Sequence, residues 1–140
     1  MLSDNAAIAT VAVKNLETAK KFYEGKLGLT KMMENEEVVA FKSGQSKLFV
    51  YRSEHAGTNK ATAVTFVADE VDDVVRKLKD RGVTFEHYDL PKMTRQGDVH
   101  VAGNMKAAWF KDPDGNILSL VTPANATERD IASASARSAT

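Results

Sequence analysis

The sequence predicts an α+β protein of two paired βαβββ modules, with a curved mixed sheet around a concave cavity and the helices outside. Three observations support this prediction. Residues 7–31 and 62–86 repeat one pattern of β-rich strand, polar residue, helical segment and glycine. Similar hairpin signatures then follow in both halves, at 40–51 and 109–120. The 140 residues, 43% of them hydrophobic, suit one domain or two small modules that share a core.

The first module is expected over 7–53, after an N-terminal extension at 1–6. Its first strand has the partly alternating sequence AIATVAV, and Asn15 follows as a helix cap. Gly28 ends the helix, because glycine readily takes the left-handed backbone at a C-cap. The apolar residues at helical spacing are Leu16, Ala19, Phe22, Tyr23 and Leu27.

The second module is expected over 62–121, after a linker at 54–61. Asp69-Glu70 precedes its helix, whose apolar positions are Val71, Val74, Val75 and Leu78, and Gly82 ends it. The last hairpin is FKDPDGNILSLV, in which Pro113 and Gly115 favour a tight turn. The tail at 122–140 is rich in Ala, Ser and Thr and is expected to be a short helix or disordered.

Four strands and one helix cannot form a closed core, because one sheet face and the sheet edges stay uncovered. Pairing two such halves would cover the edges. The concave face would then form a pocket, which is a common place for a small molecule.

Composition excludes several classes of function. The formal net charge is zero, which does not favour nucleic acids or anionic membranes. The chain has no cysteine, so disulfides, thiolate zinc sites and a cysteine nucleophile are excluded. The N-terminal sequence has no signal-peptide pattern and no apolar run is long enough to span a membrane, so we expect a cytoplasmic protein.

Three segments resemble the glyoxalase/bleomycin-resistance/extradiol-dioxygenase superfamily, also called vicinal oxygen chelate proteins. They are VKNLETAKKFYEGKLGL, LKDRGVTFE and FKDPDGNILSL, and the likeness covers about residues 7–121. The resemblance implies paired modules around a U-shaped cavity. Many members hold a divalent metal there through His and Glu side chains.

The resemblance also implies where those metal ligands would stand. The two His positions correspond to Ile8 and Ala63, and the Glu position after the DPDGN turn corresponds to Ser119. Its counterpart in the first module is Val50, or Phe49 if the alignment shifts by one residue. None of these side chains offers the nitrogen or carboxylate ligand of a divalent cation, so we expect no metal and no cofactor.

The expected cavity lining is neutral and partly aromatic. Thr10 and Thr65 should share the face of Ile8 and Ala63 by strand alternation. Aromatic residues on the hairpins could stack on a planar ligand, or could pack in the core instead. The candidate ligand-binding residues are Thr10, Phe49, Tyr51, Thr65, Tyr88, Arg95, His100, Trp109 and Ser119.

The second module carries a long insertion, 87–105, which we expect to be a lid over the cavity; the alternative is a solvated excursion. His100 alternates with valines and should lie in a short strand, where Asp98 could orient its imidazole. His87 is a further acid/base candidate. A replacement metal site of His87, His100, Glu86 and Asp98 matches no known ligand spacing.

These observations favour a metal-free protein that binds a small apolar or aromatic molecule and sequesters an antibiotic or a metabolite. The alternative is a lyase, isomerase or dioxygenase of the same superfamily, with His87 or His100 as acid/base. A partner-binding protein with a vestigial cavity is a third possibility. The expected partners are a small molecule and a second copy of the chain, without nucleic acid or membrane.

Overall fold

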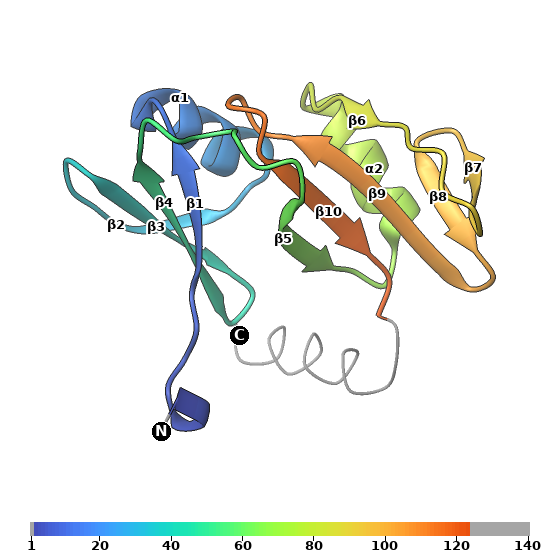
Figure 1. Ribbon diagram of the computed structural model, residues 1–140, viewed down its shortest axis with the longest axis horizontal. Helices are drawn as coiled ribbons and strands as arrows, with labels where there is room; N and C mark the ends of the chain where they lie inside the picture. The colour runs from blue at the N-terminus through green and yellow to red at the C-terminus, as the bar shows by residue number, and fades with distance from the viewer. Residues whose placement is uncertain (1, 124–140) are drawn as a thin grey trace.

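The computed structural model describes residues 2–123 and has two sheets side by side (Figure 1). The α+β class and the two βαβββ modules are confirmed, but the strands form two sheets rather than one. The edge strands β1 and β5 are the closest neighbours between the two sheets. The prediction for 124–140 lies outside the described residues. In the part that the structure describes, no helix is long and apolar enough to cross a membrane.

The first module forms a four-stranded sheet in the order β1-β4-β3-β2, which we call sheet A. β1 and β4 are parallel, whereas the other neighbours are antiparallel. A short 3₁₀ turn, η1 (Leu2–Asp4), precedes the module. The elements are β1 (Ala9–Val13), α1 (Leu16–Lys20), the π-helical η2 (Lys21–Lys26), β2 (Thr30–Glu34), β3 (Val38–Ser43) and β4 (Ser46–Arg52).

The second module forms sheet B in the order β5-β10-β9-β8-β7, and β6 also pairs with β9. Its helix α2 packs on β9 and β8 from one side of the sheet (Figure 1). The elements are β5 (Thr62–Val67), α2 (Val71–Asp80), β6 (Phe85–Glu86), β7 (Thr94–Gln96), β8 (Val99–Ala102), β9 (Met105–Lys111) and β10 (Ile117–Val121).

The helix boundaries follow the sequence signals closely. The Asn15 side chain caps α1 by accepting from the Thr18 amide at 3.0 Å. Gly28 and Gly82 end the two helical segments with φ values of 76° and 90°, in the region that favours glycine. The predicted first helix differs in one respect, because its second half is the π-helical η2. This turn buries the adjacent Phe22 and Tyr23 together.

One hydrophobic core joins the two modules. Phe22 of η2 packs edge-on against Tyr23 and also contacts Phe110 of sheet B, with ring centroids 6.3 Å apart. Inward-facing residues of both sheets, such as Val13 and Leu118, are fully buried in the same cluster. The opposite face of each sheet points away from this core, and we call it the open face.

A buried polar joint also connects the modules, at the DPDG turn. The Asp112 carboxylate accepts hydrogen bonds from the Tyr23 hydroxyl at 2.7 Å and from the Asn116 amide and side chain, each at 2.8 Å. Asn116 in turn donates to the carbonyl of Ala12 in β1, at 2.7 Å. Burial and the nearby Asp112 carboxylate raise the pKa of Tyr23 above its ordinary value, so the phenol remains a donor.

The insertion at 87–105 is not one continuous loop. It contains the antiparallel hairpin β7–β8, whose turn is Gly97-Asp98 with Gly97 at φ 65°. β8 joins sheet B beside β9, so the hairpin widens the sheet. The irregular part that remains is 87–93, between β6 and β7.

Candidate functional site

A row of side chains crosses the open face of sheet B. Residues directly opposite in neighbouring strands share a face, and the register pairs Thr65 with Ser119, Ser119 with Trp109, and Trp109 with Glu86. The Thr65 and Ser119 hydroxyl oxygens lie 2.8 Å apart and form a hydrogen bond. The centre of this face is therefore a neutral hydroxyl pair beside an indole ring.

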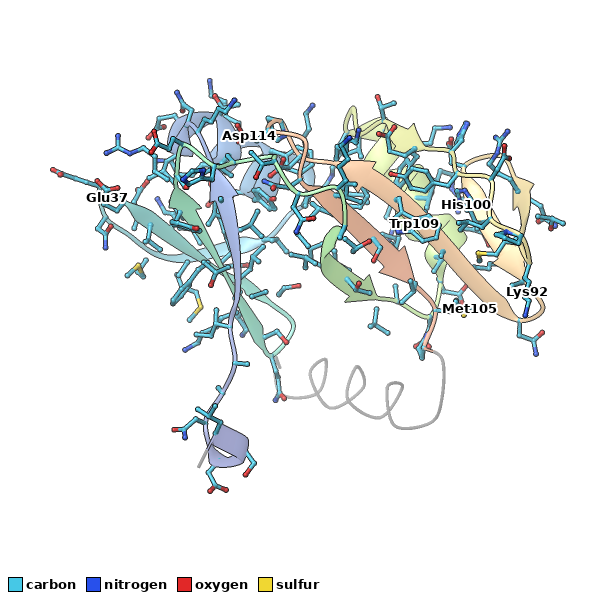
Figure 2. All side chains as sticks on the ribbon, viewed as in Figure 1. Glu37, Lys92, His100, Met105, Trp109 and Asp114 are labelled. Carbon is cyan, nitrogen blue, oxygen red and sulfur yellow. The ribbon has the colours of Figure 1, made fainter. Side chains whose placement is uncertain are left out.

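Three rings form a compact cluster next to this row. The His100 ring meets Trp109 nearly perpendicularly, with centroids 4.9 Å apart. Tyr88 lies 5.5 Å from Trp109 and 6.2 Å from His100. Figure 2 shows His100 and Trp109 together over β8 and β9. Edge-to-face packing of this kind fixes ring orientation and leaves apolar surface for a planar molecule.

His100 lies in β8, as the alternation predicts, and is 1% exposed. Its Nε2 lies 3.0 Å from the Tyr88 backbone nitrogen and 3.2 Å from the Tyr88 carbonyl oxygen. Its Nδ1 has no hydrogen-bond partner within residues 2–123. The imidazole is thus held at one nitrogen by the segment that leads away from β6.

Charged groups border the same face. Lys111 forms an ion pair with Glu86 at 3.0 Å, and this carboxylate raises the pKa of the lysine. Arg95 of β7 stands directly opposite His100 and donates to the Gly97 carbonyl at 2.9 Å. A shallow pocket of about 220 Å³ adjoins Arg95. Its lining residues are Tyr88, Asp89, Leu90, Pro91, Met93 and Arg95.

The open face of sheet A is simpler. Thr10 stands opposite Phe49, and Tyr51 stands opposite Ala12. Thr10 is exposed and donates to the Ile8 carbonyl at 3.2 Å. The candidates Phe49 and Tyr51 therefore lie outside the shared core, on the same face as Thr10.

The register decides the alternative for the fourth metal-ligand position. Thr10 pairs with Phe49 just as Thr65 pairs with Ser119, so Phe49 is the counterpart of Ser119. Val50 is fully buried in the core on the opposite face, and the choice of Val50 is corrected to Phe49.

These side chains do not fit a divalent metal. Phe49, Ile8 and Ala63 have no donor atom, and the Ser119 hydroxyl is bonded to Thr65. Within residues 2–123 no three His, Asp or Glu side chains gather as metal ligands would. No step of a mechanism is therefore assigned to a metal.

The expected pairing of Asp98 with His100 is wrong. Asp98 lies in the β7–β8 turn and contacts the Lys79 ammonium of α2 at 2.6 Å and the His87 Nε2 at 2.7 Å. Hydrogen bonds from Lys79 and then from His87 lower the pKa of this carboxyl group. His87 and Asp98 thus form a contact of their own beside α2, whereas His100 lies on the open face.

Sequence analysis missed several residues of the open faces. Met33, Val67 and Met105 are large apolar side chains that are 49%, 39% and 42% exposed. Lys42 and Lys47 stand directly opposite each other on β3 and β4. Strand alternation could have placed Val67 and Lys47, which lie two residues from the predicted positions Thr65 and Phe49. It could not have placed Met33, because the register of β2 shifts between Lys31 and Met33.

Two mixed βαβββ sheets, each with its helix packed on the face opposite the open face, define a paired-module fold with the helices outside the concave side. The model of the family described as "Glyoxalase/Bleomycin resistance protein/Dioxygenase superfamily" matches residues 6–120, and the chain belongs to this family. Among curated proteins, no significant match to the sequence is found.

Solved structures share the fold at low sequence identity. Lactoylglutathione lyase from Agrobacterium tumefaciens has a TM-score of 0.63 and 19% identity, over 84% of this chain and 93% of that one. A glyoxalase/bleomycin resistance protein/dioxygenase from Alicyclobacillus acidocaldarius has a TM-score of 0.67 and 15% identity, over 89% and 96%. A fosfomycin resistance protein from Listeria monocytogenes has a TM-score of 0.65 and 16% identity, over 89% and 97%.

Proposed function

We propose that this protein binds a small apolar or aromatic molecule on its open faces, without a divalent metal, and sequesters it. The chemistry of the positions where relatives hold metal ligands carries the proposal: Ile8, Phe49, Ala63 and the hydroxyl pair Ser119–Thr65. These four positions offer neither a charge nor a chelating group, so recognition there depends on shape and apolar area. The family includes resistance proteins by its description, so a toxic natural product is one suitable ligand.

Trp109 is the central contact of the proposed site. It is half-buried, it is bordered by two other rings, and it stands beside the neutral hydroxyl pair. An aromatic ligand that packs against it would gain about 0.5–1.5 kcal/mol beyond the burial of its area.

We also propose that the protein works as a homodimer. Tyr51 and Met33 on sheet A and Val67 and Met105 on sheet B are large apolar side chains left exposed on the open faces. A second copy that covers these faces would turn them into an enclosed cavity. Sedimentation velocity should find a dimer, and Met105→Lys should weaken it. Leu2→Lys, at an exposed apolar residue outside both sheets, is the matched control.

The ligand proposal is tested by isothermal titration calorimetry with 2-naphthol, after metal analysis of protein purified without chelator. We expect saturable binding by protein with no stoichiometric Ni, Zn, Mn or Fe. The single tryptophan, Trp109, allows the same titration to be followed by fluorescence. One equivalent of a tightly bound metal, or no binding of 2-naphthol or other aromatic probes, would contradict the proposal.

The enzymatic alternative is less well supported by the positions of the histidines. His87 is bonded to Asp98 beside α2, away from the row of Trp109 and Ser119. His100 faces the candidate site, but its Nε2 is bonded to the Tyr88 backbone. A general base must reach the proton that it removes, and of the two predicted histidines only His100 faces the site, with Nδ1 as the nitrogen left for a substrate.

A further inference from the structure

His100 presents an unusual combination of burial and incomplete hydrogen bonding. The side chain is 1% exposed, and its Nδ1 has no partner in the described part of the chain. Buried polar atoms almost always have a partner, because leaving one unpaired costs about 1–3 kcal/mol. A buried nitrogen without a hydrogen-bond partner, beside a candidate ligand surface, indicates which chemical group a ligand would contribute.

The contacts of His100 Nε2 indicate whether Nδ1 donates or accepts a hydrogen bond, and so which group would pair with it. The Tyr88 backbone N–H can only donate, so Nε2 of His100 accepts its hydrogen bond. A neutral imidazole that accepts at Nε2 carries its proton on Nδ1. The opposite tautomer would donate to the Tyr88 carbonyl instead and leave the Tyr88 amide without that acceptor. Nδ1 is therefore a buried N–H donor, and its partner must be an acceptor.

Arg95 places a positive charge beside this donor. It stands directly opposite His100 in the β7–β8 register, so the two side chains share one face. Its Nη1 donates to the Gly97 carbonyl, which leaves other guanidinium N–H groups for a second acceptor. Arg95 also lines the pocket of about 220 Å³. Asp89 is the acidic member of that lining and is solvent-exposed, so water reduces its repulsion of an anion bound at Arg95.

We propose that the ligand of sheet B carries an anionic oxygen, in a carboxylate or a phosphate group, that accepts hydrogen bonds from His100 Nδ1 and Arg95. Its apolar or aromatic body then packs on Trp109. This inference rests on the proposed binding function and adds the charge of the ligand. Because His100 is covered, the segment 87–93 that carries Tyr88 must shift to admit the ligand.

Calorimetry with three naphthalene derivatives tests the charge preference. 2-Naphthoate or 2-naphthyl phosphate should bind about tenfold more tightly than the neutral 2-naphthamide, as expected for a hydrogen bond to a charged group. The tighter of the two anions identifies the headgroup. Arg95→Gln should abolish the preference, whereas Lys92→Gln removes an equal charge from the neighbouring loop and should preserve it.

The outcomes separate the two proposals. Equal affinity for the anions and the amide would overturn the anionic ligand and leave the binding function intact. The anionic ligand is equally overturned if Arg95→Gln has no more effect than Lys92→Gln. Failure of all three compounds to bind would overturn both proposals.

A second measurement needs no variant. Long-range ¹H–¹⁵N spectra of protein labelled with ¹⁵N-histidine distinguish the two tautomers of a neutral imidazole. We expect the Nδ1–H form for His100, and a downfield shift of that proton when 2-naphthoate binds. An Nε2–H form, or an unchanged Nδ1–H resonance at saturating 2-naphthoate, would contradict the inference.

Discussion

The two open faces derive from one repeated pattern, yet their chemistry differs. The face of sheet A presents Phe49 and Tyr51 beside small and aliphatic residues, with Lys42 and Lys47 near the hairpin turn. The face of sheet B combines Trp109 with hydroxyl, imidazole and guanidinium groups from several strands. The first face therefore offers mainly apolar area, whereas the second can also select a ligand by its polar groups.

The difference arises at one interval of the repeat. In the first module β2 runs along β3 for its whole length, from Thr30 to Glu34. In the second module β6 has only two residues, after which the chain leaves β9 and returns as β7 and β8. This detour brings Tyr88, Arg95 and His100 to the face of sheet B. Most of the polar groups that distinguish this face therefore lie on a segment that has no counterpart in the first module.

The largest expected effect comes from removing the buried polar joint that connects the two modules, and with them the two faces. Asp112→Ala leaves the Tyr23 hydroxyl and the Asn116 donors without their acceptor, and should lower the free energy of unfolding by about 3 kcal/mol or more. Urea denaturation measures this change. Asp114→Ala, which removes only an exposed contact to the Lys14 amide, should cost less than about 1 kcal/mol. Similar midpoints for both variants would show that the joint contributes little.

A matched pair of substitutions tests the comparison directly. Trp109→Ala should weaken binding of 2-naphthol at least tenfold, as expected for truncation of a central aromatic contact at about 2 kcal/mol. Phe49→Ala, on the simpler face, should weaken it by less than about threefold. Calorimetry measures both. If Phe49→Ala had the larger effect, the apolar face of sheet A would be the principal site.

The stability that the β7–β8 hairpin of sheet B contributes through Asp98 should also depend on pH. The pKa of Asp98 is lowered by Lys79 and His87, so its contribution to stability is present above the unfolded-state value of about 3.9 and is lost as pH falls through the folded value. The contribution should be at most about 1 kcal/mol, since Lys79 and His87 are exposed. Asp98→Asn should remove it. Equal acid dependence of unfolding in both proteins would contradict the assignment.

The smallest expected effect concerns metal binding. Ala63→His combined with Ser119→Glu supplies two ligands on sheet B but leaves Ile8 and Phe49 on the first module unchanged. Titration with Ni²⁺ should show no strong site, because two ligands rarely hold a divalent ion tightly. Submicromolar binding would mean that other donors of the open face complete the coordination, and that its neutral description needs revision.

Sequence signals were sufficient where the physical cause was local. Asn15, Gly28 and Gly82 end or begin helices because of their own side-chain or backbone properties, and all three were placed correctly. The repeat likewise predicted both modules. These features depend on a few neighbouring residues, so one sequence contains the information needed.

Features that depend on register were harder to predict. Strand alternation suggested that Asp98 and His100 share a face, but it holds only within a strand, and Asp98 belongs to the turn. The segment TRQGDVHV contains a glycine between two short β-rich runs, and it could have revealed the hairpin. The choice between Val50 and Phe49 required the pairing of β1 with β4, because a shift of one residue reverses the face.

The joint at Asp112 also constrains how two copies could associate. Pulling one module away from the other would uncover Phe22 and Tyr23 and leave a carboxylate without its donors. Exchange of modules between chains would therefore need a transition nearly as demanding as unfolding. Whole subunits that meet through their open faces avoid that barrier, so assembly should be fast, reversible and governed by protein concentration.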